Sequence, residues 1–175
     1  AIRRAAGANI AAVDLVMGGD AKGAFCATRP PGHHAEKTRA MGFCFVANAA
    51  VAALHGIEAH GATKVAIADF DVHHGNGTQD VFWDDPRVLF ASSHQSPLYP
   101  GTGMERETGA GNIYNATIPP MGGSAEFRKV WKDRLLPAID AHAPDLLIIS
   151  AGFDAHTRDP LANLDVRDED FAWIT

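Results

Sequence analysis

Apolar and polar residues alternate along this chain with two different periods, and each period predicts a different kind of element. Apolar side chains three and four residues apart, as in residues 2–17, predict an amphipathic helix. Short runs that are almost wholly apolar predict buried strands instead. We expect strands at residues 24–27, 65–70, 87–92, 112–118 and 145–151.

Helical patterns occupy most of the intervals between these runs. They cover residues 2–17, 46–60, 78–83, 124–142 and the stretch from 168 onward. We expect Gly61 to end the second helix, Ser124 to cap the fourth and Pro137 to kink or divide it. Strands that alternate with helices are typical of βαβ units. The sequence therefore predicts an α/β fold, a three-layer αβα sandwich with a mainly parallel sheet.

Length and composition fit one globular domain. The chain has 175 residues, of which 46% are hydrophobic and 21% are charged, and these are ordinary proportions for a domain of this size. Helical patterns are interrupted at both ends of the sequence. We therefore expect residues 1–175 to form the central part of one domain, incomplete at both ends.

Charge and cysteine content indicate which partners and which compartment to expect for this protein. The formal net charge of −6 disfavours direct nucleic-acid binding but is compatible with a cationic substrate. Cys26 and Cys44 lack the spacing of a metal or redox motif, which indicates a reducing compartment. Because neither a membrane-spanning run nor a signal-peptide pattern is present, we expect a cytoplasmic protein without membrane contact. The sequence leaves the oligomeric state open.

Polar residues follow two of the apolar runs at the point where each predicted strand ends. Asp71 and His73 follow residues 65–70, and Asp154 follows residues 146–151. The carboxyl ends of parallel strands meet at one edge of the sheet, where binding crevices form. Two carboxylates and one imidazole can hold a divalent metal and leave coordination positions open. The pattern therefore predicts a catalytic metal site.

A histidine pair follows residues 24–27 and is expected at the same edge. His33 and His34 come after a Pro-Pro-Gly turn, and a neutral histidine beside a metal-activated water is a natural general base. Asp69 and Asn76 can each hold the second ring nitrogen of such a base. The alternatives are that the pair caps a loop, that Asp69 satisfies buried backbone amides and that Asn76 is a turn residue.

The remaining histidines and two aromatic residues support weaker predictions. We expect His74 to be structural, and we leave the roles of His94 and His156 open because both lie near the site edge. Three histidines in or at the ends of helices are expected to be solvated: His55, His60 and His142. Phe43 and Tyr99 are candidates for an apolar wall, with ordinary packing as the alternative.

Five motifs in register carry a family resemblance. They are Arg29-Pro-Pro-Gly-His-His-Ala35, Met41-Gly-Phe-Cys44, Asp69-Phe-Asp-Val-His-His-Gly-Asn-Gly-Thr-Gln79, Leu98-Tyr-Pro-Gly-Thr-Gly103 and Ser150-Ala-Gly-Phe-Asp154 with Asp159-Pro160. Together they resemble the zinc-dependent histone deacetylase family, in particular its class II-like bacterial members and the acetylpolyamine amidohydrolases. The resemblance implies an arginase/deacetylase-like fold, of which residues 1–175 are the central part of the catalytic domain.

The resemblance also implies roles for the site residues. The expected zinc ligands are Asp71, His73 and Asp154. Fe²⁺ and Mn²⁺ are alternative ions. His34 is the implied general base and acid, and His33 is an electrostatic partner that also binds the reactive water. Asp69 would orient His33, and Asn76 would stand behind His34.

A substrate channel and structural potassium are further implications of the resemblance. Phe43 and Tyr99 would wall a channel sized for an acyl-lysine, with Tyr99 replacing a more usual phenylalanine. An inner potassium site would use Asp69, Asp71, His73, Ser92 and Ser93. A peripheral potassium site would use the backbone around Phe82, Asp85, Val88 and Tyr114.

The implied activity is metal-dependent amide hydrolysis. Attack by a zinc-bound water would remove an acetyl or other acyl group from acetyl-lysine, an acetylated polyamine or another small amide. One alternative is an arginase-like di-manganese ureohydrolase. That chemistry requires a further carboxylate where this sequence has Gly75-Asn76.

The other alternative is a catalytically silent module that binds acyl-lysine. The family's oxyanion donor is a tyrosine in a Gly-Gly-Tyr segment, which this sequence does not contain. We expect the matching segment beyond Thr175, and we expect the strands missing with it to leave the sheet with an unpaired edge.

Overall fold

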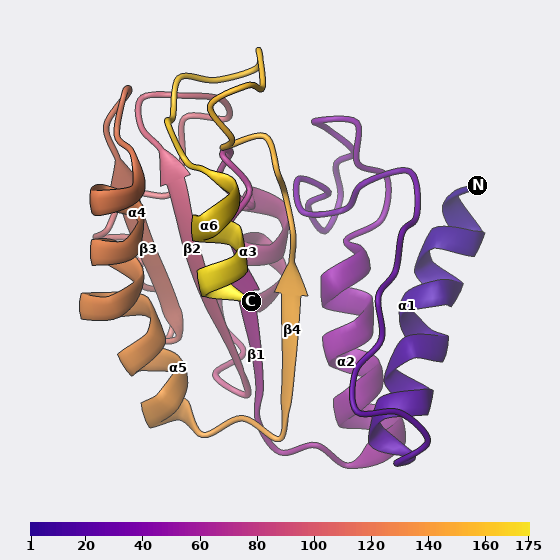
Figure 1. Ribbon diagram of the computed structural model, residues 1–175. Helices are drawn as coiled ribbons and strands as arrows, with labels where there is room; N and C mark the ends of the chain where they lie inside the picture. Colours follow the sequence, from indigo (N-terminus) through magenta and orange to yellow (C-terminus); the bar gives the residue numbers. More distant parts are fainter.

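Four short parallel strands form the sheet on which the molecule is built (Figure 1). The computed structural model describes residues 1–175. The strands lie in the order β3-β2-β1-β4, and their bounds are Val65–Asp69 for β1, Val88–Gln95 for β2, Ile113–Ile118 for β3 and Leu146–Ser150 for β4. All three strand pairs are parallel, as the alternation of helices and strands predicts.

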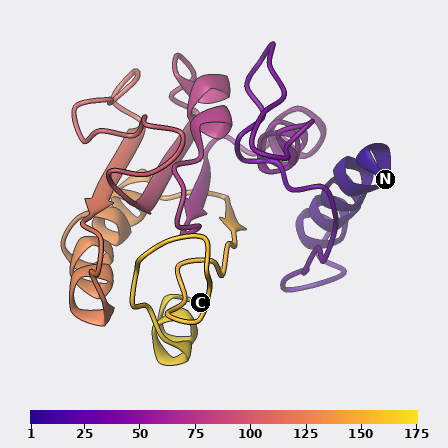
Figure 2. The same ribbon diagram turned by 90° about the horizontal axis from the view of Figure 1, so that it is seen from above.

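Helices cover both faces of this sheet and complete a three-layer sandwich (Figures 1 and 2). One face carries α2 (Asn48–His60) and α3 (Asn76–Phe82), and α1 (Ile2–Met17) packs on the outside of α2. The other face carries α4 (Ser124–Val130), the π-helical turn η1 (Trp131–Leu135), α5 (Leu136–His142) and α6 (Asp168–Ile174).

Two hydrophobic cores lie on opposite sides of the sheet because neighbouring strand residues face opposite ways. Val65 and Ile67 of β1 pack with the small side chains of α2, whereas Ala66 and Ala68 pack with the aromatic residues of α4, η1 and α6. Every residue of β1 is buried, which explains why the sequence shows a continuous apolar run there instead of an alternating one.

Pro137 divides the fourth predicted helix without breaking it. Proline lacks the N–H group that continues a helical hydrogen-bond ladder, and here it stands at the second residue of α5. The turn before it widens, so that the N–H of Leu136 donates to the carbonyl of Trp131, five residues back. Residues 124–142 are therefore helical throughout, in three segments.

Three local predictions are wrong. Residues 24–27 form no strand. β2 extends to Gln95, because polar residues that the pattern assigns to a loop are buried within it. Ser124 is the first residue of α4 and not its cap: the residue before α4 is Gly123, whose N–H donates to Glu126 at 2.9 Å.

The strand order places a topological switch point between β1 and β4. From β1 the chain adds β2 and β3 on one side, and then returns to place β4 on the other side of β1. Crevices at the carboxyl end of a parallel sheet form at such a point.

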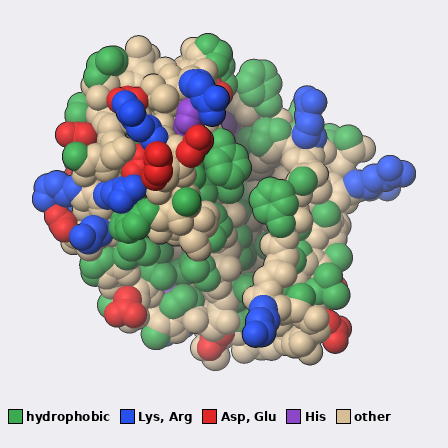
Figure 3. All heavy atoms as spheres, viewed as in Figure 1, with side chains coloured by type: hydrophobic (Ala, Val, Ile, Leu, Met, Phe, Trp, Pro, Cys, Tyr) green, Lys and Arg blue, Asp and Glu red, His purple; other side chains and the backbone are tan.

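The outer side of the molecule at β4 carries exposed apolar side chains. β4 is an edge strand, and Leu147 and Ile149 are about half exposed. Figure 3, drawn from the side shown in Figure 1, has hydrophobic side chains gathered over this part of the surface. No helix of the protein combines the length and the hydropathy needed to cross a bilayer.

Candidate metal centre and histidine pair

Three side chains converge where the segments after β1 and β4 meet. Asp71 and His73 lie just beyond the end of β1, and Asp154 lies just beyond the end of β4. The Nδ1 atom of His73 is 3.1 Å from Asp71 Oδ1 and 3.0 Å from Asp154 Oδ2. One ligand atom from each residue lies within 4.8 Å of the others. The structure thus brings together the three residues that the sequence marks as metal ligands.

Backbone hydrogen bonds hold both carboxylates in this arrangement. Asp71 accepts the N–H of His73 at 2.8 Å, and Asp154 accepts the N–H of Val72 at 3.0 Å, across the switch point. Asp69 in turn accepts the N–H of Asp71 at 3.1 Å. The segment after β1 is therefore fixed by side chains on both sides of the gap between β1 and β4.

The donor set fits a divalent cation. Two carboxylates face one imidazole nitrogen, and no lysine or arginine lies within ion-pair distance of either carboxylate. One imidazole balances at most one negative charge, and His33, 3.8 Å from Asp71, is already paired with Asp69. A cation with oxygen and nitrogen ligands would relieve the remaining excess. All three side chains are partly exposed, which leaves room for a solvent molecule or a substrate.

The predicted histidine pair lies beside this cluster, and each ring is held through its Nδ1 atom. The two ring centroids are 4.0 Å apart. His33 Nδ1 is 3.1 Å from Asp69 Oδ2, and His34 Nδ1 is 2.8 Å from Asn76 Oδ1. Because the amide oxygen of Asn76 only accepts, His34 carries its proton on Nδ1 and keeps a lone pair on Nε2. That is the tautomer a general base requires.

Glu36 fixes the orientation of Asn76, and sequence reasoning missed it. The amide nitrogen of Asn76 donates to Glu36 Oε1 at 2.7 Å. A carboxylate can only accept, so the amide must turn its oxygen toward His34. Glu36 is only two residues from His34 in the sequence. Glu36 therefore directly follows the motif that ends at Ala35, but its role depends on the fold of the loop.

Burial and charge push the pKa values of the two histidines in opposite directions. Burial disfavours a charged His33, but the charge and hydrogen bond of Asp69 outweigh it, helped by Asp71 and Asp154, and raise the pKa of His33 to about 9. Burial lowers the pKa of His34, as does the positive charge of His33. Hydrogen bonds that His73 donates to Asp154 and Asp71 raise the pKa of His73 to about 9. A bound divalent cation would oppose the charges of these carboxylates.

Two glycines let the backbone approach the site closely. Gly42 has φ of +53°, and a Cβ atom there would contact the ring of His34. A Cβ atom on Gly152 would contact the carboxylate of Asp71. Larger residues at these positions would displace a predicted base and a predicted metal ligand.

The two predicted channel residues lie at the rim. The ring of Tyr99 stands edge-on to His34, with 5.2 Å between the centroids, and Tyr99 is 46% exposed. Phe43 follows Gly42 and is 86% exposed. Tyr99 therefore packs beside His34 and still offers apolar surface to solvent, and Phe43 is largely exposed.

The predicted potassium sites are less clearly formed. The parallel register pairs Asp69 with Ser92, and both are fully buried, as the inner site requires. At the peripheral site the carbonyls of three predicted residues do converge, on the amide nitrogen of Asn112: Phe82, Asp85 and Val88, at 2.9, 3.1 and 2.8 Å. A cation there would require this amide to move.

His74 and His94 form a buried layer behind the site. Their ring centroids are 4.8 Å apart. His74 bonds Thr102 and Gln79, and His94 bonds Ser92 and the carbonyl of Gly103. Burial and the neighbouring His94 lower the pKa of His74 to about 3. This agrees with a structural role for His74 and gives His94 a similar one.

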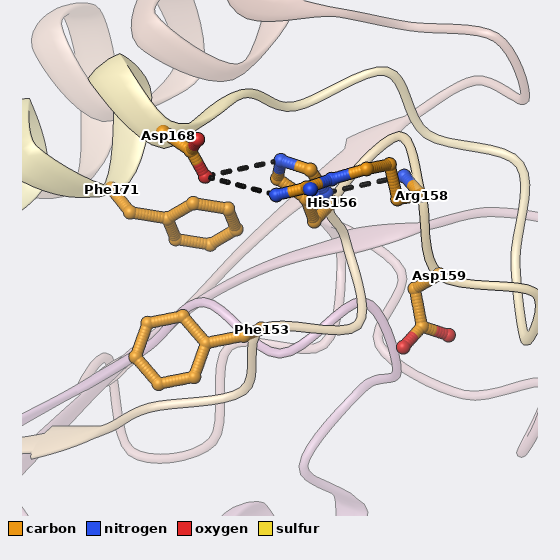
Figure 4. A pocket seen from close by; sticks show the side chains of 6 residues that line it. All are labelled: Phe153, His156, Arg158, Asp159, Asp168 and Phe171. Atoms are coloured by element: carbon orange, nitrogen blue, oxygen red, sulfur yellow. Dashed lines mark hydrogen bonds and ion pairs between the residues drawn. The ribbon is translucent and has the colours of Figure 1, made fainter.

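A cavity of about 500 Å³ lies on the other side of the segment after β4 (Figure 4). The rings of Phe153 and Phe171 form one wall, and His156 lies 3.2 Å from Asp168 on the other. Neither the predicted metal ligands nor the histidine pair line this cavity. It is therefore separate from the chemical site.

The comparisons with known proteins agree with this geometry. The profile of the histone deacetylase domain matches residues 1–175. "Histone deacetylase 14, chloroplastic" of Arabidopsis thaliana is 44% identical over 169 residues, which are 91% of this chain and 40% of the relative.

Two solved structures share the fold. The HDA15 HD domain has a TM-score of 0.94 and 42% identity, over 100% of this chain and 53% of the other. An acetylpolyamine aminohydrolase from Burkholderia pseudomallei has a TM-score of 0.91 and 36% identity, over 97% of this chain and 51% of the other. The chain thus spans 40–53% of the length of these three proteins.

Proposed function

Because this chain belongs to the histone deacetylase family, we propose that it carries the metal ligands and proton-transfer histidines of an amidohydrolase that removes an acetyl group from an amine. The observation that carries the proposal is the meeting of Asp71, His73 and Asp154 beside a histidine pair whose Nδ1 atoms are held by Asp69 and Asn76.

Zinc is the ion that fits the proposal best, with Fe²⁺ or Mn²⁺ as alternatives because two of the three ligands are oxygens. Asp71, His73 and Asp154 would hold it. When bound, such an ion supplies a Lewis acid that polarises the amide carbonyl and lowers the pKa of water from about 15.7 to about 7.

His34 is the proposed general base and acid. Its lowered pKa keeps the ring neutral near pH 7, and its Nδ1 proton is held by Asn76, so Nε2 is free to accept a proton from the attacking water. The same nitrogen would then return the proton to the departing amine, since an unprotonated amine anion is a poor leaving group.

His33 has a different proposed role. Asp69 favours its charged form, and a positive ring next to the reacting carbonyl would stabilise the negative charge that develops on the carbonyl oxygen. His33 would also orient the water by hydrogen bonding through Nε2, the nitrogen that Asp69 leaves free.

The proposed substrates are acetylated amines with an extended aliphatic arm, such as acetyl-lysine or an acetylated polyamine. Tyr99 and Phe43 offer apolar surface at the rim for the methylene groups of such an arm. The net charge of −6 favours the approach of a cationic polyamine. A di-manganese ureohydrolase is disfavoured, because Asn76 faces His34 and offers no carboxylate to a second metal.

Acetate release tests the proposal. Acetyl-lysine peptide and N-acetylputrescine are incubated with Zn²⁺ and this chain, or any longer product of the same gene, and His34→Gln is compared with His142→Gln as a control far from the site. We expect turnover that His34→Gln lowers by about 10²–10⁴-fold and His142→Gln leaves unchanged.

The metal is measured in the same samples. Turnover that is indifferent to His34→Gln would overturn the proposed roles. Zn²⁺ binding that depends on Asp154, without turnover by any product of the gene, would instead favour the silent acyl-lysine module.

A further inference from the structure

A second group of potential metal ligands lies far from the sheet edge, between the two helices at the N-terminal side of the molecule. Asp14 lies on α1, and His55 and His60 lie on α2, which packs against α1 (Figure 1). The Nε2 atoms of His55 and His60 are 2.6 and 2.8 Å from the same oxygen, Asp14 Oδ1. We call Asp71, His73 and Asp154 the first cluster. Like it, the group at Asp14 has its ligand atoms within 4.8 Å of one another.

We propose that Asp14, His55 and His60 form a second divalent-metal site, selective for zinc-like ions, that joins α1 to α2. The site is independent of the cluster at the sheet edge, and the proposal does not rest on the deacetylase function. Two imidazoles and one carboxylate, with the remaining position open to water, are a common ligand set for Zn²⁺.

The partners of Asp14 are unusual for a surface carboxylate of this protein. Other exposed carboxylates, such as Asp133 and Glu105, pair with lysine or arginine. Asp168 pairs with His156 but also faces Arg158. Asp14 faces only imidazoles. Lysine and arginine cannot act as metal ligands at neutral pH, whereas neutral imidazole can, so every partner of Asp14 is a residue that a metal can use.

The hydrogen bonds of the cluster leave several of its side-chain atoms without a partner, which also permits coordination. Asp14 is 53% exposed, and its Oδ2 atom accepts no hydrogen bond from the protein. The Nδ1 atoms of His55 and His60 have no hydrogen-bond partner in the protein either. In the hydrogen bonds to Asp14 each Nε2 donates its proton, because a carboxylate accepts. On metal binding the ring proton can reside on Nδ1, which leaves a lone pair at Nε2 for the cation.

Binding requires only a small movement. Tetrahedral zinc with metal–ligand distances near 2.1 Å separates its ligand atoms by about 3.4 Å. The present separations from Asp14 Oδ1 are 2.6 and 2.8 Å. A rotation of the exposed Asp14 carboxylate can supply the difference, because the two rings already stand apart, with 5.4 Å between centroids at 78°.

The consequence is a link between an outer helix and the core. The main contact of α1 with the rest of the fold is with α2, which itself packs on β1 and β4. An ion held by both helices binds the folded state only, so Zn²⁺ at 100 times its dissociation constant shifts the folding equilibrium by about 100-fold.

Isothermal titration with Zn²⁺ tests the site in a background where the first cluster is disabled. The background carries Asp71→Asn and Asp154→Asn, which remove both charges but keep an oxygen for the backbone N–H groups that these residues accept. We expect the background to bind one Zn²⁺ per chain. His55→Ala or His60→Ala should weaken this binding by about 100-fold or abolish it, and His142→Ala, a histidine on another helix, should not.

Thermal unfolding of the same proteins provides a second readout, with circular dichroism to confirm that each variant is folded. Zn²⁺ should raise the Tm of the background and of the His142→Ala variant, but not that of the His60→Ala variant. The proposal is overturned if the background binds no Zn²⁺, or if binding survives both His55→Ala and His60→Ala. Neither result bears on the deacetylase proposal, since the first cluster is absent from every sample.

Discussion

A single hydrogen bond decides which nitrogen of His34 is available for chemistry, and this is testable by changing its acceptor. Asn76→Asp places a carboxylate against His34 Nδ1, 2.8 Å away in the native protein. A negative charge there favours the imidazolium form, so we expect the lowered pKa of His34 to rise. The measurement is an NMR titration of the His34 ring.

The same substitution has a predictable side effect on Glu36. Native Asn76 donates to Glu36 at 2.7 Å, and Asn76→Asp would set two carboxylates against each other. Glu36→Gln restores a donor, so the double variant should recover stability while retaining the raised pKa of His34. An unchanged or lower His34 pKa in the double variant would contradict the assigned tautomer.

A second residue-scale prediction concerns Gly152. In Gly152→Ala the new Cβ atom meets the carboxylate of Asp71, which must shift away from His73 and Asp154. We expect Zn²⁺ affinity at the first cluster to fall by about 10–100-fold. Gly7→Ala is a matched control, because a Cβ atom at Gly7 in α1 meets nothing within 4 Å. Equal Zn²⁺ affinities, measured by titration with the His60→Ala change present in every sample, would show that Asp71 does not bind the metal.

For single residues, the sequence predicted where the site residues lie better than it predicted which side chains they contact. The meeting of Asp71, His73 and Asp154 followed from where two strands end, and the structure brings them together. The prediction that His55 and His60 are solvated was wrong, because both are bonded to Asp14 and are only 24% and 22% exposed. Their partner lies 41 and 46 residues away on another helix, and helix packing of this kind has no local sequence pattern.

Among the elements, α6 is linked to α4 by a buried carboxylate as well as by apolar packing. Asp170 accepts hydrogen bonds from Arg128 at 2.6 Å, from Ser124 and from the N–H of Arg167. Asp170→Asn removes the charge that strengthens these bonds, and we expect the free energy of unfolding at pH 7 to fall by about 1–3 kcal/mol. Urea denaturation measures this difference.

The pH dependence of that difference has a definite sign. Burial works against the charged form of Asp170, but its hydrogen bonds prevail and lower its pKa below the usual 3.8. Its stabilising contribution is therefore present above the unfolded-state pKa and is lost as the pH falls through the folded-state pKa. The gap between wild type and Asp170→Asn should be full at pH 6 and shrink below about pH 4. A gap that is constant over this range would mean that charge is not its cause.

The sequence predicted most elements because their patterns reflect burial. β1, β3 and β4 lie within one residue of the expected strands, and α1, α2 and α6 match the expected helices closely. The failures occur where tertiary contacts override local pattern. Ser93 and His94 are polar yet lie inside β2, where Trp131 donates to Ser93 at 2.9 Å, and Ser124 bonds Asp170 instead of capping its own helix.

Across the whole molecule, the three-layer parallel fold was predicted correctly from the alternation of strands and helices, and the family from motifs that lie on separate elements. The switch point explains why those motifs work as a unit. Asp71 and His73 follow the central strand β1, and Asp154 follows the edge strand β4. The first cluster therefore joins the two sides of the sheet at one end, while the second proposed metal site joins α1 and α2 on one face.

The first cluster should consequently stabilise the entire fold when it is loaded. Without a cation the carboxylates of Asp71 and Asp154 repel each other; His73 lies between them, and His33 lies 3.8 Å from Asp71. Zn²⁺ at 100 times its dissociation constant should add about 2.7 kcal/mol to the free energy of unfolding, which for a chain of this size raises Tm by about 5–10 °C. The chain carrying His60→Ala isolates this effect from the second site, and addition of a chelator should reverse it.

Hydrogen exchange can show where that stabilisation acts. If the ion links β4 to β1, the amides of β4 should gain the most protection on Zn²⁺ binding, because an edge strand opens before the central strands do. Asp154→Asn should abolish both the Tm increase and the added protection, since it removes the only ligand that β4 contributes. A Tm increase that persists in Asp154→Asn would mean that Zn²⁺ acts elsewhere and that β4 is held by its backbone pairing with β1 alone.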